Sequence, residues 1–355
     1  MNYDYNPFGR SDDFDYYGSM AVTDAKKSIS RTTLGLFLFC AVPTAILLVL
    51  RYVLFFALGK DGYIALASNP YYYIPMGTLF VYAVGFPFLW LLIKALPVRR
   101  SYNSNSLTIP EFLATIPIMQ FAASIGSSIG TGLDGVMQEL FHTTSENPVN
   151  NLTDGVPIWL MLIITVVIGP VVEEFIFRKL ILNRLSIYGN VFAIILSAAL
   201  FGLFHGNLYQ MFYAFFIGLI LGYVTVKGGS WLWGVALHVF MNFVNGALPT
   251  ILEGHFAGYE KAMIAFLEGD GDTFVANFNS FMIAGSFAIV VSALSVAGAI
   301  ILVYTATKRL IYVKNAPEAS IPVGKLPAVI FVNTGMILFI LYTVFCVINE
   351  YIPLI

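Results

Sequence analysis

The stretch that decides the fold is Val156–Leu182, which reads VPIWLMLIITVVIGPVVEEFIFRKLIL. A membrane-spanning helix needs about 20 predominantly apolar residues, and residues 156–172 carry no charged side chain. Charge enters only at Glu173 and Glu174, followed by Arg178 and Lys179. The stretch therefore predicts a transmembrane helix with ionisable groups in its second half.

Similar windows recur along the chain, in which 58% of the residues are hydrophobic and 11% are charged. They predict an all-α polytopic membrane protein with eight or nine transmembrane helices. The window 109–133 is the least regular, because its second half is rich in Ser, Thr and Gly, and we expect a half-buried or broken helix there. The other windows are 33–58, 72–96, 191–205, 208–226, 231–252, 278–307 and 326–348.

Small residues spaced four apart mark helix faces that can approach closely, as in the pairs Gly126/Gly130, Gly202/Gly206 and Gly218/Gly222. Lys and Arg gather in alternate connections, whereas 132–155 has no basic residue and 253–276 has only Lys261. Because cytoplasmic loops carry the excess of positive charge, we expect a cytoplasmic N-terminus and an external C-terminus. We expect a multi-pass protein of a prokaryotic plasma membrane.

Composition also excludes some classes of function. A net charge of −2 without a basic stripe argues against a nucleic-acid partner. Cys40 and Cys346 lie in separate apolar runs, so we expect neither a disulfide nor a metal-cysteine site. Residues 1–31 lack the apolar core of a signal peptide and are expected to form a polar, disordered tail.

The three ionisable residues of the opening stretch divide by helical spacing. Glu174 and Arg178 are four apart and can form an ion pair along one face. Glu173 points about 100° away from Glu174 and has Phe177 at its own i+4 position. We therefore expect Glu173 to act as a general base, with Glu174 and Arg178 as the structural brace that orients it. The alternative is that all three lie at the membrane interface, near Lys179.

His205 ends the next window, and the turn between the two helices is expected at residues 188–190. Glu174 and His205 each lie about 15 residues, or about 22 Å, from that turn, which places them at the same depth. His238 and Asn242 are four apart on one face of a later apolar window. His205 could instead be interfacial, and the His238/Asn242 pair could instead be interhelical hydrogen-bonding groups.

In order, Glu173-Glu174-x3-Arg178, Phe201-x3-His205 and His238-x3-Asn242 form three motifs on separate windows. Together they resemble the signature of the CPBP family, the CAAX proteases and bacteriocin-processing enzymes also called Abi. The likeness covers residues 171–245, and all signature positions match. It implies an all-helical intramembrane endopeptidase whose active-site cavity opens toward the cytoplasm.

The resemblance also implies roles for the motif residues. Glu173 with His205 would activate a water molecule, and His238 with Asn242 would stabilise the oxyanion. The family is described both as metalloproteases and as glutamate-type enzymes. We favour no metal and no other cofactor, with zinc on Glu173, His205 and His238 as the alternative.

Combined with the windows, the resemblance divides the chain into six parts. They are a polar cytoplasmic tail (1–31), N-terminal transmembrane helices (32–133), an external acidic loop (134–155), a catalytic transmembrane core (156–252), a second external acidic loop (253–277) and C-terminal transmembrane helices (278–355). The expected partners are the lipid bilayer and a membrane-associated protein or peptide substrate. Two other functions stay open: a transporter or channel using the buried Glu and His groups, and a non-catalytic immunity or scaffold protein.

Overall fold

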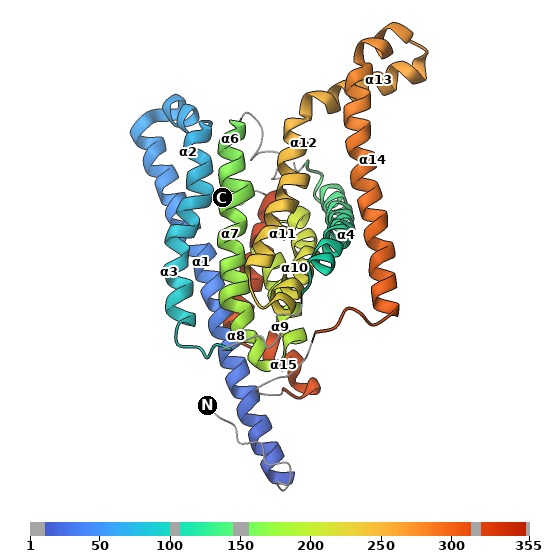
Figure 1. Ribbon diagram of the computed structural model, residues 1–355. Coiled ribbons are helices and arrows are strands. Elements are labelled where there is room, and N and C mark those ends of the chain that lie inside the picture. The colour runs from blue at the N-terminus through green and yellow to red at the C-terminus, as the bar shows by residue number, and fades with distance from the viewer. Residues whose placement is uncertain (1–10, 100–106, 145–155, 314–320, 353–355) are drawn as a thin grey trace.

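The computed structural model describes residues 11–99, 107–144, 156–313 and 321–352, and within them the secondary structure is helical throughout. Eight helices there are long and apolar enough to cross a membrane, as the sequence predicts. Figure 1 shows a helical bundle in which α1, α3, α7 and α14 run roughly upright, with α14 at the right edge and α13 above it. The expected all-α polytopic fold is thus confirmed.

The membrane-spanning helices combine α-helical segments with short 3₁₀- and π-helical segments. The α-helices are α1 (Ser11–Ala67), α2 (Pro70–Pro75), α3 (Val81–Ile93), α4 (Ile109–Phe141), α6 (Ile158–Met161), α7 (Gly169–Glu174), α8 (Asn183–Leu185), α9 (Asn190–Phe204), α10 (Leu208–Gly228), α11 (Leu232–Asn242), α12 (Leu248–Ile251), α13 (Glu253–Glu268), α14 (Gly271–Thr307), α15 (Leu326–Phe331) and α16 (Thr334–Tyr351). Wide π-helical segments cover Met76–Phe80, Leu162–Ile168, Phe175–Leu182 and Phe243–Ala247, and 3₁₀ turns cover Ser186–Tyr188 and Val323–Lys325.

Helix α9 is shorter than a full span. Its 15 residues rise about 22 Å, less than the hydrocarbon core of a bilayer, about 30 Å. The turn at its end therefore lies within the protein rather than at the membrane surface. Non-helical backbone at that depth is tolerated where it is buried in protein or lines a cavity, and this turn carries His205.

Helix α4 is continuous over 33 residues and partly buried, so of the two expected alternatives the half-buried helix is confirmed and the broken one is wrong. A Cβ atom at Gly126 or Gly130 would lie 2.6 Å or 2.5 Å from the backbone of α10. The small residues of this window thus allow two helix backbones to pack directly together. Gly202 approaches α10 in the same way, and Gly218 and Gly222 lie against side chains and backbone of α9, which confirms the packing seams at Gly126/Gly130 and Gly218/Gly222. The pair Gly202/Gly206 is confirmed only at Gly202, because Gly206 lies in the turn after α9 and faces Cys346.

Two segments expected to be irregular are helical instead. Helix α1 begins at Ser11 and includes most of the expected tail, while residues 1–10 lie outside the described part. The expected loop 253–277 holds helix α13, which packs on α14 through the stacked rings of Tyr259 and Phe281 and through buried Ala262. Apolar contact between these two helices explains why their acidic residues did not prevent helix formation.

The other expected loop, 134–155, also begins as helix, because α4 continues to Phe141; residues 145–155 lie outside the described part. Basic ends gather on one side: the ends of α3 and α14 and the short α8 all lie in the lower part of Figure 1. Two of these bases are structural. Arg99 and Arg184 are buried and donate to backbone carbonyls, Arg99 to Ser186 and Arg184 to Ile93.

Candidate active site

The brace predicted on the opening stretch is formed. Arg178 Nε lies 3.3 Å from Glu174 Oε2, and both side chains are fully buried. The guanidinium also donates to the carbonyl of Gly218 at 3.4 Å and lies over the ring of Phe201, 4.7 Å from its centroid. Glu174 ends α7, and the π-helical segment Phe175–Leu182 begins at the next residue. The buried pair thus ties this rod to α9 and α10.

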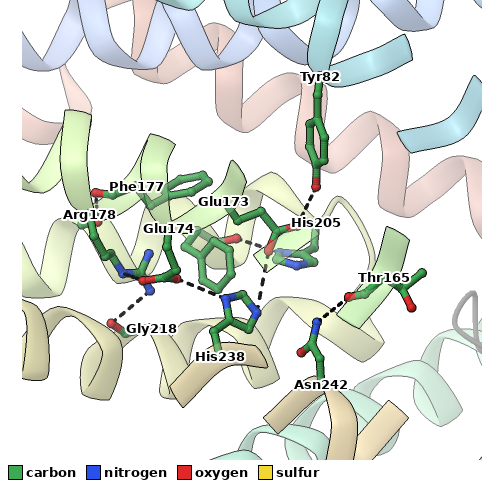
Figure 2. A network of polar contacts seen from close by, with 12 residues as sticks. Tyr82, Thr165, Glu173, Glu174, Phe177, Arg178, His205, Gly218, His238 and Asn242 are labelled. Carbon is green, nitrogen blue, oxygen red and sulfur yellow. Dashed lines mark hydrogen bonds and ion pairs between the residues drawn. The ribbon is translucent and has the colours of Figure 1, made fainter. Parts of the chain in front are cut away.

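His238 lies between the two glutamates (Figure 2). Its Nδ1 is 3.2 Å from Glu174 Oε1, and its Nε2 is 3.8 Å from Glu173 Oε2. Helix α11 approaches closely because residue 234 is glycine: a Cβ there would lie 2.4 Å from Glu174 Oε2. The turn before α11 uses Gly229, whose φ of 73° suits glycine. This close packing brings His238 within reach of both glutamates.

His205 follows the last residue of α9, and its ring is fixed by the preceding turn of helix. Its Nδ1 lies 2.8 Å from the carbonyl oxygen of Phe201. A carbonyl only accepts, so Nδ1 carries the proton and Nε2 of the neutral ring keeps its lone pair. Gly206 follows with φ 65°, and Asn207 caps α10 by accepting from the backbone N–H of Gln210. The chain reversal therefore holds His205 against the site.

Asn242 is the last residue of α11, and another π-helical segment follows it. Its side-chain Nδ2 donates to the backbone carbonyl of Thr165 at 3.0 Å, which leaves its second N–H available. Irregular helical turns of this kind occur often at functional sites, because they turn a side chain away from the regular helical face. Both His238 and Asn242 line one cavity, so their predicted shared face is present.

Tyr82 on α3 is a site residue that the sequence did not single out. Its hydroxyl donates to Glu173 Oε1 at 2.9 Å (Figure 2). It lies 91 residues before Glu173 and belongs to none of the three motifs. A hydroxyl within an apolar span needs a partner, but this signal does not distinguish Tyr82 from other tyrosines in spans, such as Tyr342.

Two cavities, of about 580 and 270 Å³, adjoin these residues. Four side chains line both of them: Thr78, Tyr82, Glu173 and His205. Only the larger cavity reaches His238 and Asn242. The side chain of Glu173 is only 15% exposed, yet it lines both cavities. Glu173 and His205 thus share two cavities, although their recorded polar contacts are with other groups.

The motif residues as placed do not match a zinc site. Among the described residues, no group of three His, Cys, Asp or Glu side chains lies close enough together to hold a metal ion. His238 Nδ1 faces Glu174 and His205 Nδ1 faces a backbone carbonyl, which are contacts that a zinc-bound histidine also makes. The spacing of the three side chains, not these bonds, is therefore what argues against zinc. A zinc site with two histidines and one glutamate needs all three directed at one point. No step is therefore derived through a metal.

Comparisons with known proteins agree with the class that fold and motifs define. Residues 155–244 match the family described as Type II CAAX prenyl endopeptidase Rce1-like. This segment includes all three motifs, from Glu173 to Asn242. Together with the membrane-spanning helices, the match supports placing the chain in the CPBP family of membrane proteases, as the resemblance in the sequence indicated.

One curated relative is described as "Putative membrane peptidase YdiL" from Bacillus subtilis (strain 168). It is 27% identical to this chain over 157 residues, which cover 43% of this chain and 62% of the relative. The matched part thus spans about three fifths of that protein. No solved structure matches the chain.

Proposed function

We propose that this chain is an intramembrane endopeptidase that hydrolyses a peptide bond of a membrane-associated protein or peptide. The observation that carries the proposal is the meeting of Glu173 and His205 at the wall of two cavities, inside a bundle of membrane-spanning helices. A buried carboxylate in a span is costly and is kept chiefly for function. The family match supports the class of reaction.

Water activation uses the free atoms of these two residues. The Oε1 atom of Glu173 accepts from Tyr82, whereas Oε2 has only the more distant His238 nearby, at 3.8 Å. A water molecule in the shared space can donate one proton to Glu173 and the other to the Nε2 lone pair of His205. As the water oxygen forms its bond to the peptide carbon, Glu173 accepts the proton as general base. The same proton then passes to the amine nitrogen when the C–N bond breaks.

The carbonyl oxygen becomes negatively charged during this attack and needs donors aimed at it. Asn242 has an N–H left after its bond to the Thr165 carbonyl. When His238 carries both ring protons, Nδ1 donates to Glu174 and Nε2–H faces the site beside Glu173. Both residues line the larger cavity, so we assign the oxyanion to that side.

Peptidomics of membranes expressing the parent protein or Glu173→Gln tests the proposal directly. Glu260→Gln on α13 is the matched control, because it makes the same change at an exposed residue away from the site. We expect fragments that depend on the parent protein, persist in Glu260→Gln and disappear in Glu173→Gln and His205→Ala. The termini of those fragments identify the substrate and the cleaved bond.

Other outcomes point to the other functions. Identical fragments in parent and Glu173→Gln membranes would overturn the proposal. Substrate flux in proteoliposomes without cleavage would identify a transporter or channel. A cellular phenotype that survives Glu173→Gln but is lost in Gly126→Leu, which blocks the packing of α4 on α10, would identify a scaffold.

A further inference from the structure

The smaller cavity has walls that the family segment does not supply. Besides Tyr82, Glu173 and the turn at His205, it is lined from α1, from the π-helical segment Met76–Phe80 and from α16. These three elements lie outside residues 155–244. The motif residues thus belong to the matched segment, whereas part of this cavity is shaped by elements outside it.

The polar groups of the α1 and α16 walls satisfy one another. Thr44 donates to the Cys40 carbonyl at 2.9 Å, and its oxygen lies 3.1 Å from the Tyr342 hydroxyl. Cys346 lies four residues after the same tyrosine on α16 and lines the same cavity. The Thr44 and Tyr342 hydroxyls are already partnered within the wall, so they offer little to a polar or charged ligand. What these two walls add to the cavity is chiefly methyl, ring and sulfur surface, while Thr78 adds a hydroxyl from the π-helical segment.

The charged side chains of the smaller cavity further restrict which ligands it can bind. Apart from Glu173 and His205, the described lining of this cavity contains no Asp, Glu, Lys, Arg or His. An acidic side chain would therefore meet Glu173 without any cation nearby, and a basic one would neutralise the carboxylate that serves as the base. The cavity suits an uncharged, apolar group.

The two cavities differ in volume and therefore in the ligands that they can hold. Pockets for complete small ligands span about 300 to 1,000 Å³. The 580 Å³ cavity falls in that range, and amide and hydroxyl groups line much of it: Gln120, Ser124, Ser127, Thr131, Gln210, Asn242 and Asn245. Such groups can bind the amides of an extended peptide. The 270 Å³ cavity falls below the range and has room for one side chain.

We propose that the smaller cavity is a specificity subsite for one uncharged, apolar side chain next to the cleaved bond, while the larger cavity holds the peptide backbone. This inference rests on the proposed peptidase function and deepens it. The side chain must belong to a residue flanking the cleaved bond, because the cavity is lined by Glu173 and His205 themselves. The protease would thus prefer peptides with a residue such as Leu, Met or Phe at that one position.

Gly77 offers a direct test, because it lines the smaller cavity and a Cβ there would meet nothing within 4 Å. Gly77→Leu therefore fills the subsite without a clash at its Cβ. Gly132→Leu is the matched control: Gly132 is also helical and open, and it lines neither cavity. The purified full-length variants would be incubated with a proteome-derived peptide mixture in detergent, and mass spectrometry would count the residues around each cleaved bond.

The parent and Gly132→Leu are expected to enrich large apolar residues at one flanking position. Gly77→Leu should cleave such peptides about 10- to 200-fold less efficiently, the range for a mismatch of one methylene or more in an apolar pocket. Peptides with Ala at that position should be cleaved at about the parent rate. Cys346→Ala, which enlarges the same cavity, should shift the preference toward larger residues.

Two results would overturn the subsite. One is an unchanged preference in both Gly77→Leu and Cys346→Ala, and the other is an equal loss for all peptides while Gly132→Leu stays active. The absence of cleavage by the parent and by every variant would instead refute the peptidase function, and the subsite with it. Cleavage without a positional preference refutes the subsite alone.

Discussion

Replacing Tyr82 by Phe removes one atom from the site, the hydroxyl oxygen that donates to Glu173 Oε1 at 2.9 Å. A hydrogen bond to a charged acceptor contributes about 1.5 to 3 kcal/mol, and each 1.36 kcal/mol is tenfold in rate. If the bond holds Glu173 in its reactive orientation, kcat should fall by about one to two orders of magnitude. KM should change little, because the phenyl ring keeps the cavity wall intact.

The assay is cleavage of an internally quenched peptide, designed from fragments found in the peptidomics, by purified protein in detergent. Tyr342→Phe is the matched control, because it removes a hydroxyl from the wall of the same cavity, where the partner is Thr44 rather than Glu173. Equal losses of kcat in the two variants, or a rise in KM alone for Tyr82→Phe, would refute a positioning role for Tyr82. A comparable unfolding midpoint for both variants separates this effect from general loss of structure.

Three further predictions concern the same site. Arg178→Met leaves Glu174 buried without its cation and should lower the free energy of unfolding by about 3 to 5 kcal/mol, measured by SDS titration. The double variant Glu174→Gln/Arg178→Met should recover most of the lost stability. Equal stability of the parent and Arg178→Met would contradict a role for the buried pair. Gly234→Ala should cost about 1 to 3 kcal/mol and reduce cleavage, because its methyl group meets Glu174 Oε2, whereas Gly132→Ala should do neither. Extensive chelation should leave cleavage unchanged; loss of cleavage that added zinc restores would contradict the metal-free mechanism.

Much of the fold follows from the sequence because the bilayer imposes a simple length rule. Apolar windows located the membrane-spanning helices, and glycine spacing located the close contacts of α4 and α9 with α10. The wrong predictions concern polar segments, for which hydropathy does not indicate a helix. Polar residues from Ser11 onward extend α1, and the acidic segment from Glu253 folds as α13 against α14. In both cases helix formation depends on packing or on continuity with a neighbouring span.

The site was partly accessible to the same reasoning. Helical spacing predicted the Glu174–Arg178 pair, and counting residues from the turn predicted a matched depth for Glu174 and His205. His205 does line the same cavities as the neighbouring Glu173. Reasoning from the sequence did not place His238 against both glutamates, because that contact depends on the close helix approach that Gly234 allows. Nor did it find Tyr82, whose partner is distant in sequence.

The contrast between Glu173 and Glu174 shows why adjacent identical residues can have different tasks. One residue along a helix is a turn of about 100°, which here directs Glu174 into contact with Arg178 and His238 and leaves it fully buried. Such a carboxylate cannot reach a water molecule without breaking an ion pair inside the protein. Glu173 keeps 15% of its side chain exposed and lines both cavities, so it alone can exchange a proton with bound water. This difference in burial and contacts is why we propose the first glutamate as the general base and the second as the structural brace.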